Sequence, residues 1–235
     1  MGSDRKPDLT VLIPTKNEAD SISQVIGEVS GVCAKLSIDY SVLVVDGHST
    51  DETVERARES GADVLLQKGP GYSGAILEGF QAAEGEFILT CDADGSHSGT
   101  VLENLWKEHD KADLVIASRF VPGGGADMST WRYVLSRILN QIFSTLLRVP
   151  VRDMSSGYRL HRKEALERFE FKGGNLSVLQ DIVSKLHMRE FRIIEVPFFY
   201  QPRRAGSSKS KVLKFGFSYL GTLFRLLRFK YLGSD

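Results

Sequence analysis

The chain has 235 residues, of which 42% are apolar and 26% are charged, and this is ordinary for a globular protein. The length suits one large domain, or one domain with an appendage. The two cysteines, Cys33 and Cys91, exclude a disulfide framework and a cysteine metal cluster. The polar start, residues 1–8, has no signal-peptide pattern, so we expect a cytoplasmic protein.

The two halves of the chain carry opposite charge. Residues 1–118 contain 9 Lys and Arg and 21 Asp and Glu, whereas residues 119–235 contain 21 and 9, which gives net charges of −12 and +12. The halves either neutralise each other within one fold, or the basic half meets an anionic partner. Phosphate groups and a membrane surface are the candidates. Nucleic acid is disfavoured because the basic half has no basic motif interleaved with aromatic residues.

Continuous apolar runs alternate with helical patterns along the first half. Strands are predicted over 9–14, 40–46, 62–67, 86–92 and 113–120, with apolar residues at helical spacing between them. Such strands form a parallel sheet that helices cover on both faces. Right-handed crossovers then bring the loops after the strands to one edge of the sheet, where ligands bind.

Polar residues gather where these strands end. Asp92 and Asp94 follow an apolar run with only Ala93 between them. Two carboxylates so close repel each other, and the pKa of one must rise unless a cation compensates them. A hard divalent cation takes oxygen ligands, usually one or two carboxylates together with substrate phosphates. The pair therefore raises the expectation of a bound cation.

Two other strand ends allow a simpler explanation. Ser49 and Glu52 form a capping-box pattern, which predicts that Ser49 caps the next helix. The segment QKGPGYSGA (67–75) offers Lys68 and a glycine-rich turn before a helix. Glycines let the backbone approach a ligand and a helix N-terminus favours anions, but the glycines could equally serve only the turn.

The second half is less regular. Residues 121–130 form a predicted flexible loop, and 176–188 a predicted helix. Between them, a long amphipathic helix is marked by the apolar positions Trp131, Val134, Leu135, Ile138, Ile142 and Leu146.

The last segment, 211–232, also has apolar residues at helical spacing, beside a narrow polar stripe. Its uncharged stretch between Lys214 and Arg225 is ten residues, whereas crossing a bilayer needs about 20. We expect a helix that lies on a membrane surface, or one that docks on the protein core or at a dimer interface.

The segments IPTKNE, VVDGHSTDET, DADGSH, ASRF and DMSSGYR, in this order, resemble the motifs of family 2 glycosyltransferases of the GT-A fold. Within that family they are most similar to the dolichol-phosphate and polyprenyl-phosphate mannose synthases. The resemblance runs from about residue 9 to about 215. A dinucleotide-binding Rossmann domain is excluded because no G-x-G-x-x-G follows the first strand.

The resemblance implies an α/β fold of the GT-A type. This is a Rossmann-like, mixed and mainly parallel sheet with helices on both faces, plus a C-terminal amphipathic helix. The expected divisions are a tail (1–8), a GT-A domain (9–210) and a helical segment that meets the membrane surface (211–235). Within the domain, 9–120 is the nucleotide-sugar half and 121–210 the acceptor half.

The resemblance also implies three groups of site residues. Asp92 and Asp94 match the D-x-D motif, which holds Mg²⁺ or Mn²⁺ against the nucleotide diphosphate, and Arg119 would bridge the diphosphate and the acceptor. The nucleotide sugar is expected at Pro14, Thr15, Asn17, Glu18, Asp46, Lys68, Gly74, Asp92 and Ala93. The acceptor phosphate is expected at Arg132, Asp153, Ser155, Ser156, Arg159, Arg203, Arg204, Ser208 and Lys209. Arg119 could instead form a structural salt bridge, and the basic loop 195–211 could be merely solvated instead of closing as a lid.

The activity implied is an inverting, metal-dependent transfer of mannose or another hexose to a polyprenyl or dolichyl monophosphate. The donor would be GDP-mannose or a UDP-sugar, and the protein would be peripheral on the cytoplasmic face of a membrane. The alternative is a glycosyltransferase with a soluble hydroxyl acceptor and Asp181 as the general base. A phosphate acceptor is already ionised and needs no such base, so Asp181 separates the two readings. A membrane adaptor without catalysis is disfavoured because the carboxylates and Arg119 are present.

Overall fold

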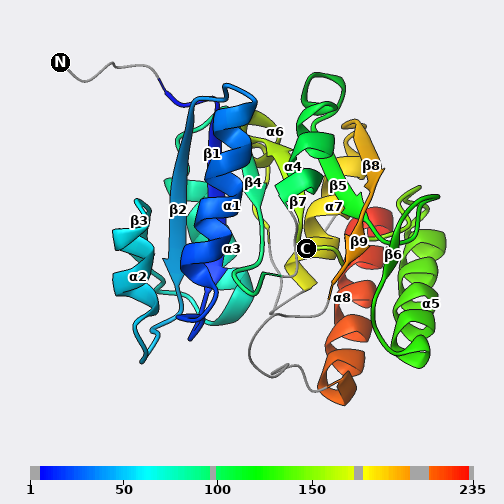
Figure 1. The fold of residues 1–235 in the computed structure, drawn as a ribbon. Coiled ribbons are helices and arrows are strands. Elements are labelled where there is room, and N and C mark those ends of the chain that lie inside the picture. Colours follow the sequence, from blue (N-terminus) through cyan, green and yellow to red (C-terminus); the bar gives the residue numbers. More distant parts are fainter. Residues whose placement is uncertain (1–5, 96–98, 172–176, 202–211, 233–235) are drawn as a thin grey trace.

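The computed structural model describes residues 6–95, 99–171, 177–201 and 212–232. Within these ranges the chain forms three layers, with a seven-stranded sheet between two layers of helices (Figure 1). The strand order is β3-β2-β1-β4-β7-β5-β8. The strands are β1 (Leu9–Thr15), β2 (Tyr40–Asp46), β3 (Asp63–Leu66), β4 (Phe87–Thr90), β5 (Leu114–Ser118), β7 (Arg159–Arg162) and β8 (Ile193–Pro197). This confirms the expected mixed, mainly parallel sheet.

The strand β7 is antiparallel to both of its neighbours, β4 and β5, and the other pairings in this sheet are parallel. The strands β1, β2, β4 and β5 therefore end at one edge, and β7 begins at that edge. The loop before β7, residues 153–158, thus meets the ends of β4 and β5. The sequence did not predict β7, because its buried Arg159 and His161 break the apolar pattern.

Helices cover both faces of the sheet. They are α1 (Ile22–Lys35), α2 (Thr53–Glu59), α3 (Gly71–Ala82), α4 (Gly99–Trp106), α5 (Thr130–Leu147), α6 (Lys163–Glu167), α7 (Val178–Met188) and α8 (Val212–Leu232), with a short 3₁₀ turn at His109–Lys111. One core cluster joins the sheet to α1 and α4, and the other joins its opposite face to α3, α5, α7 and α8.

A second, two-stranded sheet lies beside the main one. The strand β6 (Gly125–Ala126) pairs in parallel with β9 (Phe199–Tyr200). The segment 121–130, which the sequence predicts to be a flexible loop, therefore contains a short strand.

The amphipathic helix expected from residue 131 onward is α5, and its apolar side lies at the protein surface. Trp131 is 59% exposed and Ile138 is 51% exposed, and the other four apolar positions are exposed as well. The helix instead buries Asn140, Phe143 and Leu147. Burial of the less apolar side leaves an apolar surface facing outward.

The C-terminal helix α8 packs beside α5 and α7 (Figure 1). Leu223 and Leu226 enter the core, whereas Phe224 and Tyr231 remain exposed. Lys230 Nζ donates a hydrogen bond to the carbonyl oxygen of Leu147, at the end of α5. The helix therefore docks on the core along one side. Among the described residues, no helix combines the length and apolar character required to cross a bilayer.

Candidate active site at the sheet edge

The loops after β1 and β2 are joined by hydrogen bonds. The backbone N–H of Asn17 donates to Ser49 Oγ at 2.8 Å, and the N–H of Thr50 donates to Asn17 Oδ1 at 2.8 Å. The N–H of Glu18 donates to Thr53 Oγ1 at 2.9 Å. Asn17 has a φ of 56°, a left-handed conformation that asparagine tolerates well. These contacts bring the two loops expected to bind the nucleotide into one surface.

Ser49 does not cap α2, so that expectation is wrong. The helix begins at Thr53, and Ser49 instead donates its N–H to Asp46 Oδ1 at 2.8 Å and its hydroxyl to Asp46 Oδ2. Asp51 Oδ1 accepts the N–H of Thr53 at 3.1 Å and so serves the helix start. Ser49 thus binds the buried carboxylate of Asp46 instead of the helix N-terminus. The capping-box pattern does not include Asp46 and so could not predict this contact.

Thr15 and Asp46 are register partners at the ends of β1 and β2. Both are buried, and Thr15 Oγ1 has no hydrogen-bond partner. A buried hydroxyl without a partner is costly, so such a group calls for an explanation such as a bound ligand or water. The orphaned hydroxyl fits a polar ligand at this edge. Pro14, between the core of β1 and this edge, is partly exposed.

The backbone of the glycine-rich turn before α3 already binds a carboxylate of the protein, that of Glu78 on α3. The carboxylate of Glu78 accepts the backbone N–H groups of Lys68 and Gly69, at 2.8 and 2.5 Å. These hydrogen bonds lower the pKa of Glu78. A Cβ at Gly74 would lie 2.5 Å from the carbonyl oxygen of Gly69, so this glycine allows the turn to pack on the helix. Contact of Lys68 or Gly74 with a nucleotide stays a prediction.

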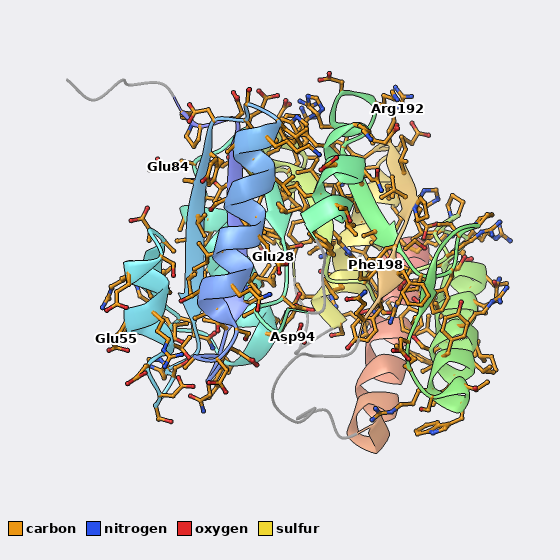
Figure 2. All side chains as sticks on the ribbon, viewed as in Figure 1. Glu28, Glu55, Glu84, Asp94, Arg192 and Phe198 are labelled. Carbon is orange, nitrogen blue, oxygen red and sulfur yellow. The ribbon has the colours of Figure 1, made fainter. Side chains whose placement is uncertain are left out.

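Asp92 and Asp94 follow β4, at the same edge. Figure 2 shows Asp94 at this edge. Asp94 and Ala93 are buried and Asp92 is partly exposed. Within the described ranges, no group of three His, Cys, Asp or Glu side chains could hold a metal ion. Two carboxylates still fit Mg²⁺ or Mn²⁺, because such an ion completes its shell with water and substrate phosphates.

Gly157, in the loop before β7, closes the other side of this carboxylate site. A Cβ at Gly157 would lie 3.5 and 3.6 Å from the two carboxylate oxygens of Asp92, and 2.9 Å from the hydroxyl of Tyr72. The loop expected to bind the acceptor therefore lies next to the expected metal ligand. Tyr72 was missed from the sequence because it is a single aromatic residue in a glycine-rich turn.

Arg119 forms a bidentate ion pair with Asp153. Its Nε donates to Asp153 Oδ2 at 2.7 Å, its Nη2 donates to Oδ1 at 2.8 Å, and Nη2 also reaches Ser155 Oγ at 2.8 Å. Burial acts to raise the pKa of Asp153, but the guanidinium and the hydrogen bonds from Arg119 and Ser155 together hold it below its ordinary value. Asn140 Nδ2 donates to Ser155 Oγ at 3.0 Å, which links α5 to this group.

Arg159 is fully buried and organises the loop from inside. Its Nε, Nη1 and Nη2 donate to the carbonyl oxygens of Ser156, Leu179 and Met154 at 2.6, 2.9 and 2.7 Å. Ser156 is also buried. The structure thus shows Arg159 bonded to backbone, and contact with an acceptor phosphate stays a prediction for it.

The remaining acceptor residues lie apart from this group or outside the described ranges. Arg132 is exposed on α5, with its guanidinium carbon 5.6 Å from the centre of the Trp131 ring. Arg203, Arg204, Ser208 and Lys209 fall within 202–211, outside the residues that the structure describes, so their roles stay predictions.

Asp181, the base required by the hydroxyl-acceptor alternative, is buried between two cations. Arg225 Nη1 on α8 donates to Asp181 Oδ1 at 3.0 Å, and Lys185 Nζ lies 3.5 Å from Asp181 Oδ2. Lys185 also donates to the carbonyl oxygen of Glu170 at 2.7 Å. The sequence suggests no partner for Asp181, because Arg225 lies 44 residues away on a separate helix and no local pattern joins them.

Comparison with known proteins agrees with this architecture. The sequence profile of Glycosyl transferase family 2 matches residues 10–169. The dolichol-phosphate mannosyltransferase of Pyrococcus furiosus is 29% identical over 94% of this chain and 64% of its own length. The polyprenol monophosphomannose synthase of Mycolicibacterium smegmatis is 35% identical over 85% of this chain and 79% of its own length.

Among solved structures, glucosyl-3-phosphoglycerate synthase of Mycobacterium tuberculosis, in complex with Mn²⁺, UDP and glucosyl-3-phosphoglycerate, has the same fold. The TM-score is 0.73 at 20% identity, and the match covers 94% of this chain and 80% of that chain. The fold is thus that of the GT-A glycosyltransferases. The chain belongs to glycosyl transferase family 2. It spans about two thirds of the Pyrococcus relative, 64% of that protein's length.

Proposed function

We propose that the chain transfers a hexose from a nucleotide diphosphate to a polyprenyl phosphate, with inversion at the sugar, and that Asp92 and Asp94 hold the Mg²⁺ or Mn²⁺ ion this requires. One observation carries the proposal. Gly157 of the expected acceptor loop lies beside Asp92 of the expected metal pair, which supports donor and acceptor sites that adjoin at one edge. The family membership agrees with this arrangement.

The residues of the chain suggest how the reaction runs. A phosphate oxygen of the acceptor forms a bond to the anomeric carbon while the bond to the donor diphosphate breaks, and that electron pair leaves with the diphosphate. Arg119, fixed by Asp153 and Ser155, is preorganised to meet phosphate charge, which a guanidinium does well. When bound, the ion offsets the charge that develops on the leaving diphosphate. Positioning and electrostatic stabilisation then supply most of the acceleration.

The surroundings of Asp181 favour the phosphate acceptor over a hydroxyl. A general base must reach the proton that it removes, at about 2.6–3.2 Å or through one water. Asp181 is fully buried, with Arg225 and Lys185 as ion-pair partners. Such a carboxylate is better suited to hold α8 in place through Arg225 than to accept a proton from a substrate. A phosphate acceptor brings its own ionised oxygen and needs no base.

The outward side of α5 and the adjoining α8 support a membrane surface as the place of the reaction. Neither helix contains an Asp or Glu residue. Exposed apolar side chains, among them Trp131, Ile138 and Phe224, stand beside the exposed Arg132 and Arg228. An apolar face flanked by Lys and Arg binds the interface of a membrane that contains anionic lipid. The polyprenyl chain of the acceptor lies in such a membrane.

Purified protein with Mn²⁺ and a polyprenyl phosphate in detergent micelles tests the proposal. GDP-mannose, UDP-glucose and UDP-N-acetylglucosamine serve as separate donors, and the extracted lipid is assayed for sugar. We expect a sugar-phosphate lipid from one donor, with free nucleotide diphosphate in equal amount. Transfer to soluble sugars or alcohols, with no glycosylated lipid from any donor, would contradict the proposal.

A further inference from the structure

The side of α5 that faces the protein reaches Arg119 and its partner Ser155. The hydroxyl of Tyr133 donates to the carbonyl oxygen of Arg119 at 3.3 Å, and Asn140 Nδ2 donates to Ser155 Oγ at 3.0 Å. Tyr133 and Asn140 are seven positions apart, so they lie on the same face of the helix. Asn140 is 4% exposed. The helix that carries an exposed apolar side thus meets the candidate site with its opposite side.

The orientation of the Asn140 amide is fixed by two partners. Its Nδ2 donates to the carbonyl oxygen of Ser136 at 2.8 Å and to Ser155 Oγ at 3.0 Å. A carbonyl oxygen can only accept, so the nitrogen of the amide and not its oxygen must face Ser136. The two hydrogens of this nitrogen therefore serve one partner on α5 and one partner in the loop before β7.

The hydroxyl of Ser155 has three partners, and they use its whole hydrogen-bonding capacity. It accepts from Arg119 Nη2 at 2.8 Å and from Asn140 Nδ2 at 3.0 Å, and it donates to Asp153 Oδ1 at 3.0 Å. A hydroxyl has one hydrogen and two lone pairs, and guanidinium and amide N–H groups can only donate, so each role is determined. The hydroxyl therefore cannot turn away from Arg119 without also giving up the hydrogen bond from Asn140.

We propose that Asn140 is a positioning residue for Arg119: its amide holds the Ser155 hydroxyl in place, and that hydroxyl, with Asp153, holds the guanidinium. Groups that act on a reacting phosphate must be held within about 0.5 Å of the productive geometry, and partners behind them provide this precision. This inference rests on the proposed function, because it assumes that Arg119 meets phosphate charge during transfer. It adds to that function a residue of α5 that touches neither substrate.

The test uses the Asn140→Leu variant, whose side chain has a similar size and forms no hydrogen bonds. Turnover is measured in detergent micelles with Mn²⁺, polyprenyl phosphate and the donor that the parent uses. We expect kcat to fall about 10- to 100-fold, because a small misplacement of a charged group has a large effect on the rate. Gln141→Leu is the matched control, since it removes a neighbouring but exposed amide of α5 that bonds to Thr145. Its kcat should stay within about twofold of the parent.

A double-mutant cycle distinguishes positioning from a general structural role. In the Ser155→Ala background the hydroxyl that connects Asn140 to Arg119 is gone, so Asn140→Leu should lower kcat by less than about twofold, because effects at contacting residues are not additive. A merely structural role would lower kcat by the same factor in both backgrounds. That result, or a parent-like kcat for Asn140→Leu in the parent background, would overturn the inference.

Asn140→Ser is a second variant for the case that Asn140→Leu does not fold. A serine hydroxyl in a helix can donate to the carbonyl four residues before it, here that of Ser136, but its shorter side chain does not reach Ser155. Its kcat should also fall about 10-fold or more, and a parent-like value would overturn the inference. A parent protein that transfers sugar from no donor would instead refute the proposed function, and the inference with it.

Discussion

The guanidinium of Arg119, at the end of β5, donates two hydrogen bonds to the buried carboxylate of Asp153, at 2.7 and 2.8 Å. The backbone N–H of Arg119 donates to the same carboxylate at 3.1 Å. The pair therefore fastens the expected acceptor loop to the sheet. The structural salt bridge that the sequence left open for Arg119 is thus present, and contact of its guanidinium with phosphate stays a prediction.

Asp153→Asn should destabilise the fold, because it leaves a mostly buried guanidinium without its counter-charge. Breaking a buried pair costs about 3–5 kcal/mol, and the retained amide should keep the loss near the lower end. Asp127→Asn, on an exposed loop position, is the control and should change little. Urea unfolding at pH 7 measures both. An Asp153→Asn variant as stable as the parent would show that the pair does not hold the loop.

The loss from Asp153→Asn should also depend on pH. The folded pKa of Asp153 is lowered, so its contribution to stability is complete above the unfolded pKa, about 3.9, and is lost as the pH falls through the folded value. The difference in unfolding free energy between parent and variant should thus be constant from pH 6 to 8 and shrink at more acidic pH. Unfolding curves at pH 7, 4 and 3 measure this change.

Asp94→Asn should abolish most turnover while the protein stays folded. The substitution keeps the shape of a buried side chain and removes the charge that would hold the ion. Removing one electrostatic contact of this kind costs about 10²–10³ in kcat. Donor affinity should fall as well, and EDTA should abolish the activity of the parent. Steady-state kinetics and donor titration measure these effects, and full activity in EDTA would refute the metal assignment.

Arg203→Ala and Arg204→Ala should each raise the KM for polyprenyl phosphate more than they change donor affinity. A charge-assisted hydrogen bond to phosphate contributes about 1.5–3 kcal/mol, which corresponds to about 10–150-fold. Arg58→Ala, an exposed arginine on α2, is the control for loss of one positive charge. If donor Kd rises while the acceptor KM stays constant, the loop serves the donor instead.

Ile138→Asp should weaken binding to vesicles that contain anionic lipid, because Ile138 belongs to the exposed apolar side of α5. Leu66→Asp offers a matched control, since Leu66 is 50% exposed and Ile138 51% exposed, but Leu66 lies on β3 at the far edge of the sheet. Burying one such side chain contributes about 1.5–3 kcal/mol. Vesicle co-sedimentation measures the effect, and equal losses in the two variants would place the membrane contact elsewhere.

The sequence predicts the strands of the fold better than it predicts the contacts of the candidate site. The strands β1, β2 and β3 follow apolar runs, and their predicted bounds match the structure within one residue. The pattern of apolar residues does not predict the structure where polar groups are buried against one another. Arg159 in β7 bonds to Leu179, and Asp181 pairs with Arg225 of α8, so both depend on partners distant in the chain that no local pattern specifies. The carboxylate of Glu78 binds the backbone of the glycine-rich turn nine residues before it, a contact that the glycines do not predict.

The orientation of the apolar side of α5 also could not be predicted from the local sequence pattern. An amphipathic pattern predicts a helix and an apolar side, and the usual inference is that this side faces the core. Here Asn140 turns inward because Ser155 of the acceptor loop accepts its amide hydrogen, and the apolar side turns outward. The exposed apolar side chains lie on α5 as well as on α8, so the membrane contact that we propose involves both helices.

Asp181 decides between the two acceptor classes, and its burial complicates the simple substitution. Asp181→Asn leaves Lys185 buried without its counter-charge, which should destabilise the protein by about 3–5 kcal/mol and could reduce activity through unfolding alone. Removing the charges of Asp181 and Lys185 together is expected to be far less costly, because replacing both partners of a buried pair is often neutral. The remaining cation, Arg225, has a side chain that is 26% exposed, so solvent compensates part of its charge.

The Asp181→Asn/Lys185→Met variant therefore separates the two roles. If Asp181 only anchors α8 and the acceptor is a phosphate, the double variant should regain stability, and its kcat should stay within about tenfold of the parent, since no proton transfer has been lost. If Asp181 is a general base for a hydroxyl acceptor, the double variant should fold and bind donor normally while its kcat falls by about 10²–10⁴. Thermal unfolding, donor titration and turnover on the same preparations measure all three quantities. A stable, donor-binding but inactive double variant would move the assignment to a hydroxyl acceptor.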